Sequence, residues 1–289
     1  MKKIVAIAGP TASGKTDLSI KLAKQFNFEI INCDSTQMYQ YYNIGTAKIK
    51  KEEMEGNQHH LLDFLSPEND YSIYHFQRDA RQKISTIDLP LFVGGSGLYL
   101  KSVLFDYELS CKPLIKQKFT NGDLENMLRI IKKKDPQLVL DVKNPLRIIN
   151  AYYDILSGDL RSKKNKKNSP LYSFLILYLD IDRQFLKNRV ILRLENMLKN
   201  GFIEEVKFLL TKFPKANFNI IGYREIKCFL EGKFSLDEAK CLIIQKTMQY
   251  AKRQKNWFQN QMKPVILDAL SPFLEQIAFQ MISNFIKKT

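Results

Sequence analysis

Cysteine is scarce in this 289-residue chain, and long apolar runs are missing from it. The four cysteines, Cys33, Cys111, Cys228 and Cys241, form no C-x-x-C pair, which argues against a zinc finger and against a disulfide framework. No stretch approaches the length of a membrane span, and the first apolar run leads into a glycine-rich loop instead of a cleavage site. We therefore expect no signal peptide, no membrane partner and a cytoplasmic location.

Acidic residues are also in deficit, since 30 Asp and Glu stand against 45 Lys and Arg, for a formal net charge of +15. An enzyme of small metabolites needs a few cations at its site, whereas binding to a polyanion strengthens with each phosphate that a cation neutralises. The excess charge therefore favours a nucleic-acid partner. General lysine enrichment, which the many Lys, Ile and Asn residues also fit, is the alternative on charge alone.

Residues 3–16 carry the strongest local pattern. An apolar run at 4–8 has the character of a buried parallel strand, the next eight residues match G-x-x-x-x-G-K-[ST], and a helix-compatible segment follows at 17–26. In that context backbone N–H groups and the helix N-terminus attract phosphate, the lysine adds a charge, and the threonine hydroxyl can hold Mg²⁺. The predicted phosphate loop consists of Gly9, Pro10, Thr11, Ala12, Ser13, Gly14, Lys15 and Thr16.

Asp34 ends the next expected strand, at residues 29–34. Ligands of an open parallel sheet lie beyond the carboxyl ends of its strands, so this carboxylate should stand near whatever the phosphate loop holds. A cap on a turn or helix is the competing interpretation. A third expected strand, 89–93, leads into the glycine-rich turn 94–99, which lacks a Lys-Thr pair and is interpreted as a close backbone approach to a ligand.

The fold prediction is α/β, with a P-loop NTPase-like core of parallel sheet flanked by helices and a small all-helical insertion lobe. The core is expected at 1–106 and 171–289, and the lobe at 107–170, where helices at 123–134 and 145–156 replace the strand signal. A basic run at 161–167 is either a solvated loop or a phosphate contact. His59 and His60 lack a third ligand at a zinc-like spacing, so a structural or hydrogen-bonding role is favoured for them.

The C-terminal part is expected to return to a strand, at 171–182, and then to helices. A helix at 183–200 carries Arg189 and Arg193 four residues apart, hence on one face. A capping box at 235–238 opens a long helix whose mixed cations and aromatics suit a nucleic-acid face, although an ordinary solvated amphipathic helix fits the same pattern.

Together these motifs resemble the tRNA dimethylallyltransferases (the IPP transferase family), in the family's order and over nearly the whole chain. The segments that carry the resemblance are 9–16, 34–39, 44–48, 59–63, 93–99, 201–206, 221–223 and 250–257. The resemblance implies transfer of a dimethylallyl group from dimethylallyl diphosphate to the exocyclic amine (N6) of the adenosine just 3′ of the anticodon. The substrates would be tRNAs that read codons beginning with U, and diphosphate would be released.

By the same resemblance the phosphate loop holds the prenyl diphosphate, with Thr16 on Mg²⁺. Asp34 acts as the general base, and Arg193 stabilises the departing diphosphate together with Lys15 and Thr11. The implied tRNA-facing residues are Asp34, Ser35, Thr36, Gln37, Ser96, Arg147, Arg224, Lys252, Arg253 and Trp257. The expected partners are the anticodon stem-loop of tRNA and dimethylallyl diphosphate, and the expected state is a monomer.

The chain departs from the family at 150–154, where Asn-Ala-Tyr-Tyr-Asp replaces a second arginine and an Ala-Leu-Glu run, and its insertion is short. Three other functions compete with the prediction of a tRNA dimethylallyltransferase. An adenylate (free nucleotide) dimethylallyltransferase leaves the +15 charge unexplained. A P-loop kinase of a small metabolite gives no account of residues 34–37, and a non-enzymatic RNA-binding protein gives none of Lys15 and Thr16.

Overall fold

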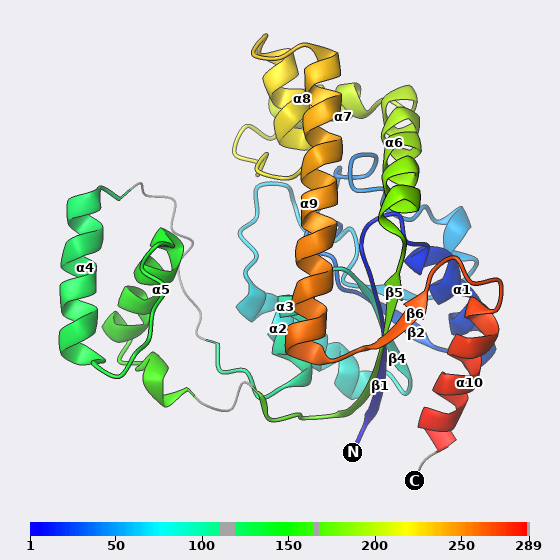
Figure 1. The fold of residues 1–289 in the computed structure, drawn as a ribbon, viewed down its shortest axis with the longest axis horizontal. Coiled ribbons are helices and arrows are strands. Elements are labelled where there is room, and N and C mark those ends of the chain that lie inside the picture. The colour runs from blue at the N-terminus through cyan, green and yellow to red at the C-terminus, as the bar shows by residue number, and fades with distance from the viewer. Residues whose placement is uncertain (110–118, 165–167, 288–289) are drawn as a thin grey trace.

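A six-stranded sheet forms the centre of the molecule, and every strand pairing in it is parallel. The computed structural model describes residues 1–109, 119–164 and 168–287. The strands are β1 (Lys3–Ala8), β2 (Glu29–Asn32), β3 (His59–His60), β4 (Pro90–Gly94), β5 (Ser173–Asp180) and β6 (Val265–Asp268). Their spatial order is β3-β2-β4-β1-β5-β6 (Figure 1), so β1 delivers the phosphate loop to the middle of the carboxyl edge.

Both faces of the sheet are covered, which explains why the strands read as continuous apolar runs. On one face Ala6 of β1 and Tyr178 of β5 belong to a core with Phe76. On the other face Val5 and Leu177, their neighbours along the same strands, belong to a second core. Successive residues of a strand point to opposite faces, so a run without polar residues serves two cores at once.

Helices cover the sheet, and α6 to α9 project beyond its carboxyl edge (Figure 1). The helices around the sheet are α1 (Lys15–Phe26), α2 (Ile73–Thr86), α3 (Gly97–Leu104), α6 (Arg183–Lys199), α7 (Phe202–Lys212), α8 (Tyr223–Leu230), α9 (Leu236–Met262) and α10 (Leu274–Lys287), with a 3₁₀ turn η1 (Glu52–Met54). The predicted capping box opens α9: the N–H of Glu238 donates to Ser235 Oγ at 3.2 Å, and the N–H of Ser235 donates to Glu238 Oε2 at 2.7 Å.

Two helices, α4 (Asn121–Lys134) and α5 (Pro145–Leu156), stand apart from the sheet in Figure 1. Their own apolar cluster, which includes Met127 and Ile148, holds them together. The chain leaves and re-enters the core at one neck, where Asp106 N–H donates to the Ser169 carbonyl at 2.8 Å. This arrangement is that of an insertion, whose boundaries at 107 and 170 stay a prediction.

The basic run near the end of this lobe makes contacts inside the protein. In the 3₁₀ turn η2 (Arg161–Lys163), Arg161 Nε lies 2.5 Å from Asp154 Oδ2, and the nearby Lys164 Nζ lies 2.8 Å from Asp159 Oδ2. The first half of the run therefore ties the lobe together. Residues 165–167, the rest of the run, lie outside the described part of the chain.

The predicted α/β architecture is confirmed, with one strand that the sequence did not predict. β3 has only two residues, and it extends the sheet beside β2. His60 Nε2 there lies 2.7 Å from Glu29 Oε2, and His59 Nδ1 lies 2.9 Å from the carbonyl of Asn57. Both histidines thus have the hydrogen-bonding role favoured for them.

Candidate active site

The phosphate loop runs from the end of β1 into α1, and it favours glycine at two points for different reasons. Gly14 has a φ of +89°, in the left-handed region that favours glycine, and it immediately precedes the helix. A Cβ added to Gly9 would lie 2.9 Å from the carbonyl oxygen of Leu179 on β5. Close packing of the loop against β5 therefore requires the first glycine of the motif, and the turn into the helix requires the second.

Lys15 lies at the start of α1, and its ammonium folds back over the loop to donate to the carbonyl of Pro10 at 2.6 Å. The pKa of Lys15 is lowered to about 8, chiefly because its ammonium is shielded from water and secondly because Arg193 lies nearby. The Asp34 carboxylate opposes both effects. The Lys15 ammonium is thus repelled by a second cation and has little contact with water. Binding of an anion here would offset both effects.

Two buried polar atoms in this region lack a hydrogen-bond partner among the described residues, namely Ser13 Oγ and Arg193 Nε. Ser13 is 1% exposed and belongs to the loop itself. A buried donor left unpaired is costly, and a phosphate oxygen would satisfy it. The donor set of the loop thus fits a diphosphate.

Asp34 follows β2 by two residues, and its Oδ1 accepts hydrogen bonds from the N–H of Thr36 at 2.9 Å and from its hydroxyl at 2.7 Å. The carboxylate therefore does cap a turn, as the competing interpretation held. It also acts on the site, since its charge raises the pKa of both Lys15 and Arg193 against the effect of burial. Both bonds that it accepts from the described residues go to Oδ1, which leaves Oδ2 for another donor.

The two arginines predicted to share a face of α6 both turn toward the phosphate loop and the loop after β2. Arg189 Nη1 donates to the carbonyl of Ala12 at 3.3 Å, and Arg193 Nη2 donates to the carbonyl of Thr46 at 3.4 Å. Burial lowers the pKa of Arg193, and the Asp34 carboxylate opposes this shift. Residues from α1, the β2 loop and α6 therefore meet in one electrostatic cluster.

The polar residues after Asp34 are held by hydrogen bonds to neighbouring loops. The N–H of Ser35 donates to Ser96 Oγ at 3.2 Å, and Gln37 Nε2 donates to the Thr46 carbonyl at 3.0 Å. Thr16 lines a small cavity, about 40 Å³, together with Asn32 and Gln37. The predicted tRNA-facing residues 34–37 and Ser96 thus lie together beside the phosphate loop.

The backbone of the glycine-rich turn after β4 lies close to side chains of α9. A Cβ on Gly95 would lie 2.2 Å from Gln254 Nε2, and one on Gly97 would lie 2.2 Å from the Trp257 ring. Gln254 Nε2 donates to the carbonyl of Gly95 at 2.9 Å. These glycines dock α9 against the turn, which gives them a packing role. The close approach to a ligand expected from the sequence stays a prediction.

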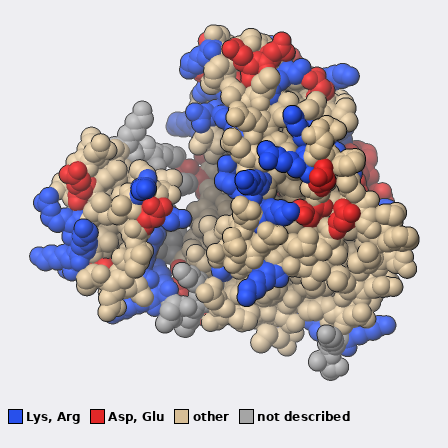
Figure 2. Space-filling view, viewed as in Figure 1, with Lys and Arg blue, Asp and Glu red and all other residues tan. Residues whose placement is uncertain are grey.

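The other predicted tRNA residues are spread over three helices. Lys252 and Arg253 are exposed on α9, where the Arg253 guanidinium lies 5.7 Å from the centre of the Tyr250 ring. Arg224 is exposed at the start of α8. Arg147 lies apart on α5, where it pairs with Asp141 at 3.3 Å. Figure 2 shows Lys and Arg over the α4–α5 lobe and over the face formed by α9 and α6.

Two residues of the site were not predicted as site residues. Partial burial and, after it, the negative charge of Asp34 raise the pKa of Tyr250 to about 12. Glu205 of α7 accepts hydrogen bonds from the loop that contacts Arg193. Both stood in motifs of the family, but nothing in their local sequence indicates which distant group they contact.

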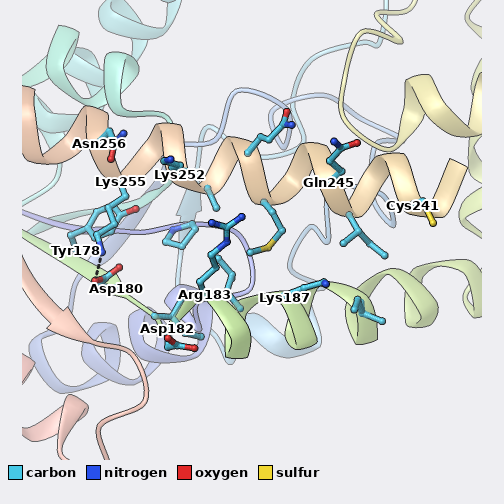
Figure 3. A pocket seen from close by; sticks show the side chains of 18 residues that line it. Tyr178, Asp180, Asp182, Arg183, Lys187, Cys241, Gln245, Lys252, Lys255 and Asn256 are labelled. Atoms are coloured by element: carbon cyan, nitrogen blue, oxygen red, sulfur yellow. Dashed lines mark hydrogen bonds and ion pairs between the residues drawn. The ribbon is translucent and has the colours of Figure 1, made fainter. Parts of the chain in front are cut away.

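A cavity of about 1130 Å³ opens between α6 and α9 (Figure 3). Arg183 and Lys187 line it from α6, and Lys252 and Lys255 from α9, with Lys255 Nζ 2.7 Å from Asp180 Oδ2. The phosphate loop contributes Pro10 to this cavity, whereas Lys15, Asp34 and Arg193 are not among the residues that line it.

Within the described part of the chain, no helix combines the length and the apolar character needed to cross a membrane.

Known proteins match the chain along nearly its full length. It is 72% identical over 288 residues to a tRNA dimethylallyltransferase of Phytoplasma australiense, covering 100% of this chain and 99% of that protein. It is 49% identical over 286 residues to the tRNA dimethylallyltransferase of Acholeplasma laidlawii, covering 99% of each.

Solved structures agree in fold. A tRNA delta(2)-isopentenylpyrophosphate transferase of Staphylococcus epidermidis matches with a TM-score of 0.76 and 32% identity over 100% of both chains. A eukaryotic dimethylallyltransferase described as acting on tRNA matches with a TM-score of 0.86 and 28% identity, over 99% of this chain and 80% of that chain.

Family models cover both halves of the site. A model described as isopentenyl transferase matches residues 2–66, which hold the phosphate loop and Asp34. A model described as IPP transferase matches residues 37–261, which hold Arg193 and α9. With that match over most of its length and relatives aligned from one end to the other, the chain belongs to the IPP transferase family, among the tRNA dimethylallyltransferases.

Proposed function

We propose that this tRNA dimethylallyltransferase transfers the dimethylallyl group of dimethylallyl diphosphate to N6 of the adenosine 3′ to the anticodon, in tRNAs reading codons that begin with U. The observation that carries the proposal is the meeting of Lys15, Asp34 and Arg193 in one cluster. Displacement of a diphosphate by an amine requires cations that bind the leaving diphosphate. It also requires, beside them, a base such as a carboxylate that takes the proton of the amine.

The diphosphate leaves with the electron pair of its bond to the allylic carbon, so negative charge grows on its oxygens. Lys15 and Arg193 face that charge from two sides, and Ser13 and Thr11 add hydroxyl donors from the loop. Fixed donors aimed at developing charge typically contribute about 10²- to 10³-fold each in rate. Arg193 Nε, buried without a partner among the described residues, is such a donor.

The donor set beside the loop also fits Mg²⁺. Thr16 is exposed and offers a hydroxyl where the phosphates would lie, and Mg²⁺ prefers one or two protein oxygens combined with phosphate oxygens and water. When bound, the ion would neutralise part of the charge on the diphosphate. Thr16 is the residue proposed to hold it.

Asp34 is proposed as the general base. As the nitrogen–carbon bond forms, N6 must lose a proton, and Asp34 Oδ2 is the oxygen that no described residue occupies. The hydrogen bonds from Thr36 to Oδ1 hold the carboxylate in one orientation. General base catalysis typically contributes about 10²- to 10⁴-fold.

The tRNA is proposed to bind over the mouth of this cluster. A base in an anticodon loop leaves its stack at small cost, so the adenine can enter beside Asp34. Residues 34–37 and Ser96, which lie beside the phosphate loop, are proposed to receive the base, and the exposed cations of α8, α9 and α5 are proposed to contact the tRNA backbone. The proposed contacts are Ser35, Thr36, Gln37, Ser96, Arg147, Arg224, Lys252, Arg253 and Trp257.

The test measures entry of labelled dimethylallyl diphosphate into unmodified tRNA or AMP, with Mg²⁺ present. We expect label in tRNA, none in AMP, and none in a tRNA whose adenosine 3′ to the anticodon is replaced by guanosine. Asp34→Asn should lose at least about 10²-fold in rate. The matched control, Asp88→Asn, alters an exposed acid before β4, at the opposite edge of the sheet.

Label in AMP would assign the chain to the free-nucleotide class. Label in the guanosine-substituted tRNA would place the modification elsewhere in the molecule. An Asp34→Asn variant as active as Asp88→Asn would remove Asp34 from the mechanism.

A further inference from the structure

Glu205, near the start of α7, accepts hydrogen bonds through both of its carboxylate oxygens. Oε2 accepts from the backbone N–H of Asn43 at 2.9 Å and of Ile44 at 2.7 Å. Oε1 accepts from the backbone N–H of Gly45 at 3.1 Å and from the hydroxyl of Tyr223 at 2.6 Å. One side chain thus satisfies three consecutive N–H groups of a loop that belongs to no helix or strand. Bonds to a charged acceptor are about twice as strong as neutral ones.

This loop lies tightly against α7 and α8. A Cβ on Gly45 would lie 2.1 Å from the Phe202 ring and 2.6 Å from the Tyr223 ring. Only a backbone without a side chain can come so close to both aromatic rings. The position of the loop is therefore fixed by contact as well as by hydrogen bonds, and any shift would have to move it outward.

The carbonyl that follows the anchored segment contacts two residues of the site. Thr46 O accepts from Gln37 Nε2 at 3.0 Å and from Arg193 Nη2 at 3.4 Å. Among the described residues Thr46 is the hydrogen-bond acceptor of Arg193, and the Nε of this arginine is buried without a partner. The guanidinium plane is thus oriented by one loop carbonyl, and Glu205 holds that loop.

We propose that Glu205 is a positioning residue for the prenyl transfer. It fixes residues 43–45, the loop presents the Thr46 carbonyl, and the carbonyl sets the guanidinium of Arg193 toward the leaving diphosphate and the amide of Gln37 toward the tRNA side. Glu205 itself touches no substrate. The inference rests on the role proposed above for Arg193.

The test begins with Glu205→Gln, which keeps the size of the side chain but places an N–H₂ donor against backbone N–H donors. We expect kcat to fall about 10- to 100-fold, because misplacement of a transition-state donor by about 1 Å costs that much. KM for dimethylallyl diphosphate should change far less than kcat. Glu204→Gln is the matched control, since Glu204 is the exposed neighbour on the same helix. Tyr223→Phe removes one of the four bonds while keeping the ring, and it should give a smaller loss of kcat.

A double-mutant cycle separates positioning from a general loss of stability. If Glu205 acts through Arg193, adding Glu205→Gln to Arg193→Gln should lower kcat by less than twofold beyond the single arginine variant. Multiplying effects would overturn the inference, as would a Glu205→Gln enzyme with the kcat of the Glu204→Gln control. If Glu205→Gln does not fold, Tyr223→Phe replaces it in the same cycle. Full activity of Arg193→Gln alone would instead overturn the role proposed for Arg193.

Discussion

The lowered pKa of Lys15 predicts that binding of the prenyl diphosphate weakens as pH rises from 7 to 9. With a pKa of about 8, the ammonium of the free enzyme carries its charge in about nine molecules of ten at pH 7 and in about one of ten at pH 9. A bound diphosphate favours the charged form and raises the pKa. The complex therefore keeps a proton that the free enzyme has lost.

The size of the effect follows from this proton. Between pH 7 and 9 the dissociation constant should rise about tenfold, or about 1.4 kcal/mol, since the free enzyme must first regain its charge. The last ionisation of a phosphate group has a pKa of about 6, so the ligand is already about nine-tenths ionised at pH 7 and contributes little between pH 7 and 9. Proton uptake on binding should grow from about 0.1 at pH 7 to about 0.9 at pH 9.

Titration calorimetry measures both quantities. Dimethylallyl diphosphate is titrated without tRNA in two buffers of different ionisation enthalpy, and the difference in heat gives the protons taken up. Lys15→Arg, whose charge persists above pH 12, should bind with little change across the range. A dissociation constant of the natural enzyme that stays the same at pH 7 and 9, with no proton uptake at pH 9, would refute the argument.

Three further predictions follow from contacts described above. Gly97→Ala should displace the Trp257 side chain, because the new Cβ would lie 2.2 Å from its ring. The chain has one tryptophan, so its fluorescence spectrum reports this displacement, and an unchanged spectrum would contradict the packing. Lys252→Gln should weaken tRNA binding and reduce the slope of log affinity against log salt by about one, and an unchanged slope would remove Lys252 from the phosphate contacts. Phe76→Ala should lower the free energy of unfolding by about 3–5 kcal/mol, because Phe76 is 0% exposed, and urea denaturation measures the loss.

The sequence predicted those parts of the site that consist of residues close together in the chain. The phosphate loop is one stretch, and its strand, turn and helix follow from glycine conformation and apolar runs. Asp34 was placed beside it by a general rule of parallel sheets, which the pairing of β2 and β1 with β4 satisfies.

Long-range contacts explain what the sequence could not predict. Glu205 holds backbone groups about 160 residues earlier in the chain, and hydrogen bonds to a backbone N–H place no demand on the type of side chain there. The turn after β4 illustrates the same point, because its glycines accommodate α9 and the sequence shows only that they are small. β3, with two residues, is too short to show a period.

The place of β1 in the sheet has a consequence for synthesis on the ribosome. Lys3 pairs with Ser173 and Val5 with Leu91, so the first strand made waits for partners that emerge far later. At about 5–20 residues per second, β1 would stand without its β5 neighbour for about ten seconds or more after it is made. During that time an apolar segment and its unpaired edge are open to other chains, and a nascent chain stalled before β5 is an aggregation-prone species that the finished enzyme is not.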